Sequence, residues 1–143
     1  MADLFTNIEL SKKDGTIVNG GEALAGKIVA LYFSAHWCPP CRQFTPVLKD
    51  FYKELEGEDF EIVFVSFDRS EPDLKAYLSE CHGDWLHIPF GSDHIQELAS
   101  KFDVNGIPEL VVIKPNGDII TDDGSDDVLE KPPKQVLAEW KSA

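Results

Sequence analysis

Two short apolar runs give the clearest structural signal along the chain. Residues 27–33 (KIVALYF) and 60–67 (FEIVFVSF) are rich in β-branched and aromatic side chains, and each run is too short for a buried helix. Such runs are typical of strands covered on both faces of a sheet. Between them, apolar residues recur at intervals of three and four from Phe44 to Leu55, which predicts an amphipathic helix that Pro46 should kink. A helix between two buried strands predicts a right-handed βαβ unit with parallel strands.

Two further helices are predicted in the middle of the chain. Ser70 stands where an N-cap is expected, ahead of a helix with one apolar face. That face holds Leu74, Tyr77, Leu78 and Cys81. The same spacing predicts a later helix from Ile95, Leu98, Ala99 and Phe102.

The last third of the chain predicts a hairpin, a loop and a helix. Residues 110–113 and 119–121 flank the turn residues 114–118, which indicates a β-hairpin and makes the sheet mixed. The acidic run 122–127 is interpreted as a solvated surface loop, because it lacks the ligand spacing of a calcium loop. A final helix should begin near Pro132 and Pro133, with an apolar face of Val136, Leu137 and Trp140.

Composition narrows the classes of function. With 143 residues, 43% of them hydrophobic, the chain is expected to form one domain over residues 1–143. A formal net charge of −13 disfavours nucleic acid and anionic membranes as partners. No apolar run approaches membrane-spanning length, and residues 1–7 lack the pattern of a signal peptide. We therefore expect a cytoplasmic protein, with the nucleus as an alternative location.

The segment WCPPCR joins the first predicted strand to the first predicted helix. Residues three apart on a helix have Cα atoms about 5 Å apart, which is within the range that a disulfide requires. At the helix N-terminus, free N–H groups and the dipole stabilise a thiolate, so we predict Cys38 to be the nucleophile and Cys41, one turn inward, to be the resolving cysteine. Pro39 and Pro40 should stiffen this active-site loop, and Trp37 offers an apolar plate beside the reactive sulfur.

A zinc site is the alternative explanation for the cysteine pair. Tetrahedral zinc needs four ligands. The other candidate ligands are spread along the chain with no second pair at ligand spacing: His36, Cys81, His82, His87 and His94. Cys81 lies on an apolar helical face, so a small buried side chain is expected there. The redox interpretation is therefore favoured, and no metal ligands are assigned.

Residues 33–46 (FSAHWCPPCRQFTP) closely resemble the active-site segment of tryparedoxins and nucleoredoxins. The resemblance continues through residues 64–68, 85–90 and 102–108. It implies an α/β protein with a thioredoxin-like fold, a central mixed β-sheet flanked by α-helices. It also implies a cis bond before Pro108, facing the cysteines, and a backbone at Ile107 that pairs with an extended substrate. Ile107, Pro108 and Trp37 are thus the expected substrate contacts.

One position departs from thioredoxin itself. Thioredoxins carry a buried aspartate six residues before the first cysteine, where it relays a proton to the resolving cysteine, and this chain has Tyr32 there. Tryparedoxins are similar to this chain at that position. The proton acceptor for Cys41 is therefore unassigned, with water or a nearby carboxylate as candidates. His36 is expected to be a solvated loop histidine.

Together these features predict a thiol-disulfide oxidoreductase that reduces protein disulfides and acts as a monomer. An upstream reductase or a low-molecular-weight dithiol should recharge it, and no cofactor is expected besides the redox-active Cys38–Cys41 disulfide. The alternative is a redox-sensitive protein-binding module of the nucleoredoxin kind, in which turnover is incidental. Tryparedoxins draw electrons from trypanothione, and similarity along the second half of the chain favours the nucleoredoxin-like group.

Overall fold

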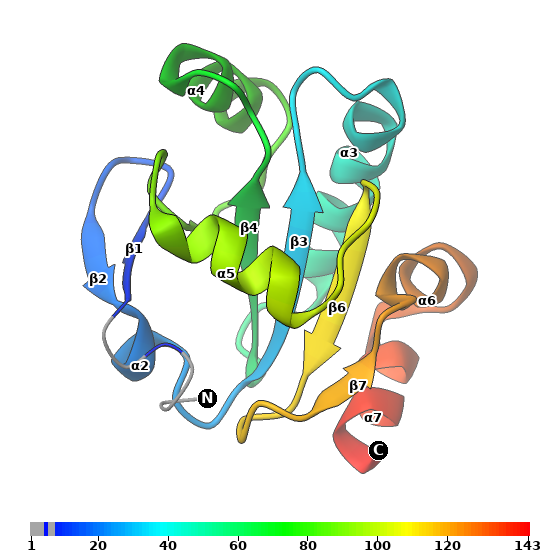
Figure 1. Ribbon diagram of the computed structural model, residues 1–143. Helices are drawn as coiled ribbons and strands as arrows, with labels where there is room; N and C mark the ends of the chain where they lie inside the picture. The colour runs from blue at the N-terminus through cyan, green and yellow to red at the C-terminus, as the bar shows by residue number, and fades with distance from the viewer. Residues whose placement is uncertain (1–4, 6–7) are drawn as a thin grey trace.

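A seven-stranded mixed sheet forms the centre of the computed structural model, which describes Phe5 and residues 8–143 (Figure 1). The strand order is β2-β1-β5-β4-β3-β6-β7. The strands are β1 (Glu9–Ser11), β2 (Ile17–Asn19), β3 (Ile28–Ser34), β4 (Phe60–Ser66), β5 (Leu86–His87), β6 (Glu109–Ile113) and β7 (Ile119–Thr121). The predicted βαβ unit is confirmed, because β3 pairs with β4 in parallel, and the sheet is mixed, because β3 pairs with β6 antiparallel.

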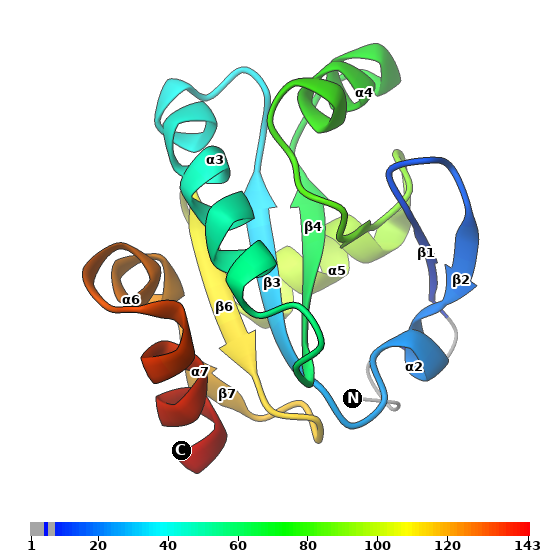
Figure 2. The same cartoon turned by 180° about the vertical axis from the view of Figure 1, so that it is seen from behind.

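Helices cover both faces of this sheet. They are α2 (Gly20–Ala23), α3 (Pro39–Glu54), α4 (Glu71–Glu80), α5 (Asp93–Lys101), α6 (Gly124–Glu130) and α7 (Pro133–Ser142). Helix α5 crosses one face (Figure 1), and α3 lies on the opposite face, with α6 and α7 beside it (Figure 2). Within the described residues, none of these helices combines the length and the apolarity needed to cross a membrane.

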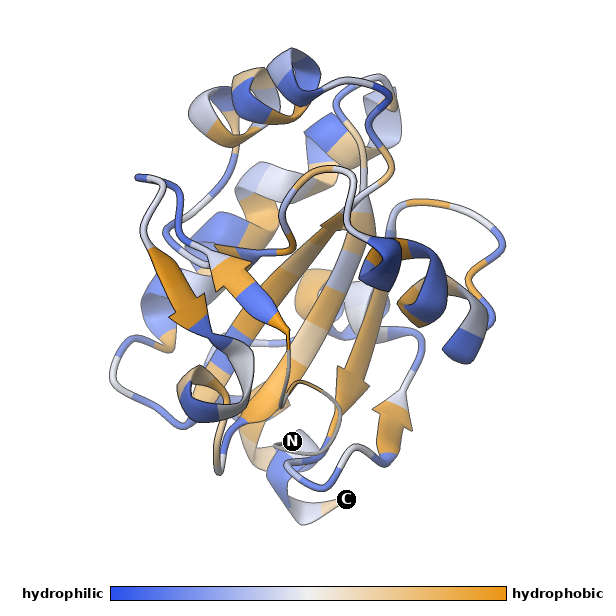
Figure 3. Ribbon diagram, turned by 60° about the vertical axis from the view of Figure 1, so that its left-hand side comes forward, coloured by the Kyte–Doolittle hydropathy of each residue, from blue (hydrophilic) through white to orange (hydrophobic). Residues whose placement is uncertain are grey.

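Strand β3 is buried along its whole length and divides the core in two. Ala30 and Tyr32 face the α3 side, whereas Val29, Leu31 and Phe33 face the α5 side. This alternation follows from the period of two in a strand, and the hydropathy colouring shows the apolar strands running between the helices (Figure 3). Each fully buried aliphatic or aromatic side chain contributes about 1.5–3 kcal/mol to the stability of the folded state. Strand β3 is therefore held firmly, and it fixes where the loop to α3 begins.

Three helices begin where the sequence predicts. Ser70 caps α4 by accepting a hydrogen bond from the backbone N–H of Asp73, and α7 starts directly after Pro132. Helix α3 continues past Pro46 to Glu54. The pattern missed the short elements β1, β2, β5 and α2, which have too few residues to show a period.

Two expectations about single segments need correction. Cys81 packs against the core as its apolar face predicts, but it lies at the C-cap of α4 and is only partly buried. The acidic run 122–127 is not a solvated loop, because α6 begins at Gly124 inside it. Gly124 packs so closely on β6 that a Cβ there would lie 2.9 Å from a methyl group of Val112.

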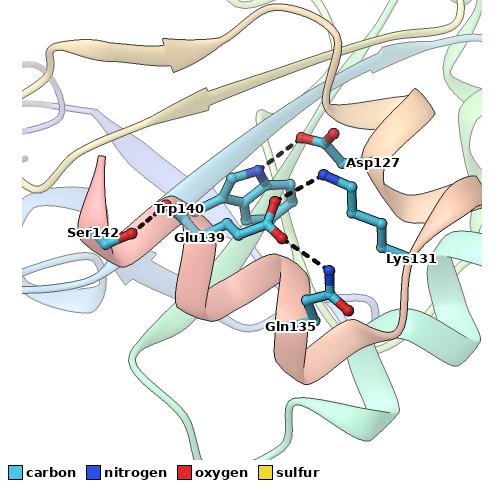
Figure 4. Close-up of polar contacts among 6 residues, drawn as sticks. All are labelled: Asp127, Lys131, Gln135, Glu139, Trp140 and Ser142. Atoms are coloured by element: carbon cyan, nitrogen blue, oxygen red, sulfur yellow. Dashed lines mark hydrogen bonds and ion pairs between the residues drawn. The ribbon is translucent and has the colours of Figure 1, made fainter.

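Helix α6 is held by a tertiary contact that its sequence does not reveal. The indole Nε1–H of Trp140, on α7, donates to the carboxylate of Asp127 at 3.0 Å (Figure 4). Lys131 and Glu139 form an ion pair at 2.8 Å beside it. Trp140 is itself buried, with its ring 5.7 Å from Phe51. One carboxylate of the acidic run thus accepts from a donor of the core and ties α6 to α7.

Replacing Asp127 with alanine should destabilise the protein. The change leaves the buried Trp140 Nε1–H without an acceptor, which costs about 1–2 kcal/mol. Urea unfolding followed by Trp fluorescence measures the loss. Asp126→Ala, an exposed neighbour with no side-chain contact described, is the matched control and should stay within about 0.5 kcal/mol of the native protein. Equal effects of the two variants would contradict this account of α6.

Candidate active site

The cysteine pair lies where β3 passes into α3. Cys38 is the N-cap residue of α3, and its Sγ accepts a hydrogen bond from the backbone N–H of Cys41 at 3.4 Å. Both are free thiols. Cys38 is 6% exposed, whereas Cys41 is 0% exposed. The predicted placement at the helix N-terminus is confirmed, and the outer sulfur is the one that an incoming group can reach.

The loop before β6 faces the outer cysteine. The thiol of Cys38 points at the carbonyl oxygen of Ile107, with sulfur and oxygen 3.9 Å apart. The Ile107–Pro108 peptide bond is cis, as the resemblance implies. Pro39 and Pro40 are exposed at the start of α3, where a missing N–H costs no helical hydrogen bond. The structure thus brings together residues that are almost seventy positions apart in the chain.

Trp37, which directly precedes Cys38, is exposed. Its side chain is 47% exposed. It is also fixed, because its Nε1–H donates to the carbonyl of Phe67 at 3.1 Å and the guanidinium of Arg69 lies 5.1 Å from the ring centroid. An apolar surface held in one orientation loses little entropy on binding.

The loop that carries Trp37 is anchored by a carboxylate that the sequence reasoning missed. Asp68 accepts hydrogen bonds from the backbone N–H of His36 at 2.7 Å and from the hydroxyl of Ser66 at 2.7 Å. The His36 ring is only 26% exposed and pairs with Glu80 at 3.3 Å, so the expected solvated histidine is wrong. The position of Asp68 just after a buried strand was the available signal.

Beneath the cysteines lies a set of buried hydroxyls. The Tyr32 hydroxyl contacts Thr45 Oγ1 at 2.7 Å, and Thr45 donates to the carbonyl of Cys41 at 2.8 Å. Burial raises the pKa of Tyr32 far above its ordinary value, so the phenol stays neutral. Burial and a hydrogen bond with Cys38 raise the pKa of the Cys41 thiol to about 12. Cys41 is therefore a thiol at neutral pH until its environment changes.

A buried histidine supports this region from behind. His82 is completely buried, and its Nδ1 accepts from the indole of Trp85 at 3.1 Å, which leaves the N–H on Nε2, an atom without a partner. Its ring lies 4.3 Å from that of Tyr77. Burial lowers the pKa of His82 to about 3, so the ring is neutral. Among the described residues, no group of three or more His, Cys, Asp or Glu is gathered as a metal cluster.

The family model described as thioredoxin-like matches residues 26–119, which include the cysteine pair and the cis proline. The chain belongs to the thioredoxin-like family. Mouse nucleoredoxin is 44% identical over 110 residues, which are 75% of this chain and 25% of that protein. The chain spans about a fifth to a quarter of the curated nucleoredoxins that it matches.

Solved structures of thioredoxin-like proteins share the fold at full length. Thioredoxin from Wuchereria bancrofti is 57% identical with a TM-score of 0.86, and the match covers 96% of both chains. Tryparedoxin II complexed with glutathionylspermidine is 38% identical with a TM-score of 0.82, covering 91% of both chains. The thioredoxin-like fold and the nucleoredoxin and tryparedoxin resemblance are thereby confirmed. These relatives support a redox enzyme of the thioredoxin type in general.

The buried His82 should make the protein lose stability in mild acid. His82 binds a proton less tightly in the folded protein than in the unfolded chain. The neutral His82 therefore makes its full contribution to the free energy of unfolding above the ordinary pKa of 6.5, and this contribution is lost as the pH falls from 6.5 toward about 3. At pH 4.5 the loss is ~2–3 kcal/mol. Urea unfolding at pH 7 and pH 4.5 measures it.

His82→Gln, which keeps an acceptor for Trp85, should show a smaller drop in stability between the two pH values than the native protein. His94→Gln, at a partly exposed histidine of α5, is the control and should show the native drop. If His82→Gln loses as much stability between pH 7 and pH 4.5 as the native protein does, His82 is not the cause of the acid sensitivity.

Proposed function

We propose that the chain is a protein-disulfide reductase in which Cys38 attacks the substrate and Cys41 resolves the mixed disulfide. The difference in burial between the two sulfurs carries the proposal. Cys38 is the N-cap residue of α3 and keeps a small exposed surface, whereas Cys41 lies fully buried one turn inward with its N–H directed at Cys38 Sγ. Only the outer sulfur can meet a disulfide on another protein.

The reaction balances with the cysteine pair alone. The Cys38 thiolate forms a bond to one substrate sulfur, and the other substrate sulfur leaves as a thiolate that takes a proton from water. Cys41 then loses its proton to water and bonds to Cys38, which releases the first substrate sulfur. Two electrons pass to the substrate, and the pair ends as a disulfide. No further cofactor is needed for this exchange.

The surface around Cys38 fits an extended segment of a protein substrate. The sulfur faces the carbonyl of Ile107, which precedes the cis Pro108, and the exposed Trp37 directly precedes Cys38 in the chain. A hollow of about 370 Å³ next to Phe67 continues this surface, with the half-exposed Phe90 on its wall. A larger hollow of about 870 Å³ lies near the far end of α3 and includes neither cysteine.

A dithiol or an upstream reductase must return the pair to the reduced state. The tryparedoxin II structure with glutathionylspermidine supports a low-molecular-weight thiol as one source of electrons. We place the protein in a reducing compartment, the cytoplasm or nucleus, because reduction of disulfides needs such a supply. The roles of both cysteines can be tested with dithiothreitol as the donor.

Insulin-disulfide reduction driven by dithiothreitol should be accelerated by the native protein and not by Cys38→Ser, which lacks the attacking sulfur. Turbidity measures the rate, and a loss of at least ~100-fold is expected because Cys41 is buried and burial raises the pKa of the partly exposed Cys81 thiol. Cys81→Ser is the matched control for loss of a thiol and should keep the native rate. Failure of the native protein to accelerate the reaction would overturn the proposal.

Cys41→Ser should trap the substrate as a stable mixed disulfide on Cys38, because the resolving sulfur is missing. Mass spectrometry after proteolysis locates the bond. A trapped bond on Cys41 in the Cys38→Ser protein would reverse the order of attack. Trapping in Cys41→Ser without turnover by the native protein would favour the redox-sensitive binding module.

Trp37→Ala should weaken binding of protein substrates without changing the chemistry of the sulfur. Losing the apolar contact of a half-exposed indole costs about 1–1.5 kcal/mol, so KM for insulin should rise about tenfold while kcat changes little. Leu129→Ala, on the exposed side of α6, is the control for loss of a surface apolar group. An unchanged KM in Trp37→Ala would contradict the assigned contact.

A further inference from the structure

Both arginines of the chain lie beside the cysteine pair. Arg42 directly follows Cys41 in the first turn of α3, and the guanidinium of Arg69 lies over the ring of Trp37, the residue before Cys38. The formal net charge of the chain is −13, so its surface repels anionic groups in general. Cations at this site therefore favour anionic substrates locally, against the charge of the rest of the chain.

Arg69 is held in place by Trp37. The centre of its guanidinium is 5.1 Å from the centroid of the indole ring, which is a favourable cation–π contact. The ring is itself fixed, because its Nε1–H donates to the carbonyl of Phe67 at 3.1 Å. Arg69 is exposed and Trp37 is 47% exposed, so this contact lies at the surface. A guanidinium that is already oriented loses less side-chain entropy when it binds a partner.

The N–H donors of Arg69 are available to a partner. In the part of the chain that the structure describes, its guanidinium forms no ion pair and no hydrogen bond. The neighbouring carboxylate, Asp68, is occupied, because its oxygens accept from the backbone N–H of His36 and from the hydroxyl of Ser66, each at 2.7 Å. A guanidinium presents its donors as a planar fork that matches a carboxylate in a bidentate pair. The site thus presents this fork to solvent beside the residue that precedes the nucleophile.

We propose that Arg69 determines specificity by binding a side-chain carboxylate of the protein substrate, on a glutamate or aspartate close to the disulfide that is attacked. This inference rests on the proposed function, because the substrate is the disulfide that Cys38 attacks. Trp37 directly precedes Cys38, and an extended chain advances about 3.3 Å per residue. A guanidinium over the Trp37 ring can therefore reach a side chain about one or two residues from the substrate cysteine. Arg69 makes and breaks no bond in the exchange.

Two other cations provide matched comparisons. Arg42 is also exposed at the site, but within the described residues no aromatic ring contacts its guanidinium. It would have to lose more side-chain freedom to hold a carboxylate. Lys101, the last residue of α5, is also held over a ring, with its Nζ 5.9 Å from the centroid of Phe102. Arg42 tests whether any charge at the site suffices, and Lys101 tests whether a cation over a ring elsewhere does.

A single-turnover reaction with activated peptides measures the preference. Each peptide has one cysteine as a 2-pyridyl disulfide, with glutamate or glutamine next to that cysteine, before it in one pair of peptides and after it in the other. The Cys38 thiolate bonds to the peptide sulfur, and the bond between the two sulfurs of the peptide breaks. The pyridine-2-thiolate that leaves takes a proton from water and is followed by stopped-flow absorbance. All proteins carry Cys81→Ser to remove the third thiol.

The ratio of the rate constants for the glutamate and glutamine peptides should fall about fivefold in Arg69→Gln, in at least one pair, because one exposed ion pair is lost. The glutamine peptides should react within about twofold of their rate with the protein that keeps Arg69, because they lose no charge pair. Arg69→Glu should reverse the preference, so that a peptide with lysine at that position reacts about fivefold faster than the glutamate peptide.

Two controls test whether the preference belongs to Arg69. Arg42→Gln and Lys101→Gln should each leave the ratio within about twofold of its value in the protein that keeps all three cations. A ratio that stays fixed in Arg69→Gln, or that falls as far in Arg42→Gln as in Arg69→Gln, overturns the inference. Equal slowing of both peptides in Arg69→Gln also overturns it, because Arg69 would then act only through the position of Trp37.

The electron donor is the other source of a carboxylate, and a second pair of probes separates it from the substrate. Dihydrolipoate and its uncharged amide, dihydrolipoamide, each reduce the oxidised Cys38–Cys41 pair and are themselves oxidised to a disulfide. Their two rates should keep the same ratio in Arg69→Gln. A fall in that ratio with the peptide ratio fixed assigns the carboxylate to the donor and refutes the proposal.

The same peptides separate this inference from the proposed function. Absence of any release with either peptide refutes the proposed function itself. Normal release with the same ratio in every variant leaves that function standing and refutes only the role of Arg69.

Discussion

The burial of β3 on both faces is the constraint on which the rest of the site depends. The strand pairs with β4 on one side and with β6 on the other, and its side chains reach both halves of the core. The carboxyl end of β3 is therefore fixed in place, and the loop that follows it ends with Cys38 at the N-cap of α3. Because β6 is the antiparallel partner, the cis proline before it arrives at the same edge of the sheet. The strand thus positions the nucleophile and the backbone beside it together.

The same strand supplies the polar groups beneath the site. Tyr32 and Ser34 both belong to β3, yet their hydroxyls meet partners from α3 and α4. Asp68 is occupied with the His36 backbone and Ser66, and Glu80 with the His36 ring. In a chain of formal charge −13, a pocket built from neutral donors avoids the repulsion that a buried carboxylate would impose on a thiolate.

Support for α3 comes from the end of the chain. Trp140 packs against Phe51 of α3 and Phe60 of β4, and its indole is satisfied by Asp127. Helices α6 and α7 thereby lie beside α3 on the same face of the sheet (Figure 2). A helix whose first turn holds two reactive sulfurs needs this support, because small displacements of the N-terminus would change the spacing of the pair.

The sequence by itself determined the features that depend on local patterns. The buried runs 27–33 and 60–67, the helical spacing after Cys41 and the motif at Cys38 all lie within short stretches, where period and capping residues decide the structure. Only the tertiary structure decided that 124–130 is helical, because its stabilising partner, Trp140, lies on another helix. It also decided that Ser34, Thr45 and Tyr77 meet under Cys41. Hydrogen bonds between residues far apart in the chain leave no period in the sequence, so packing alone reveals them.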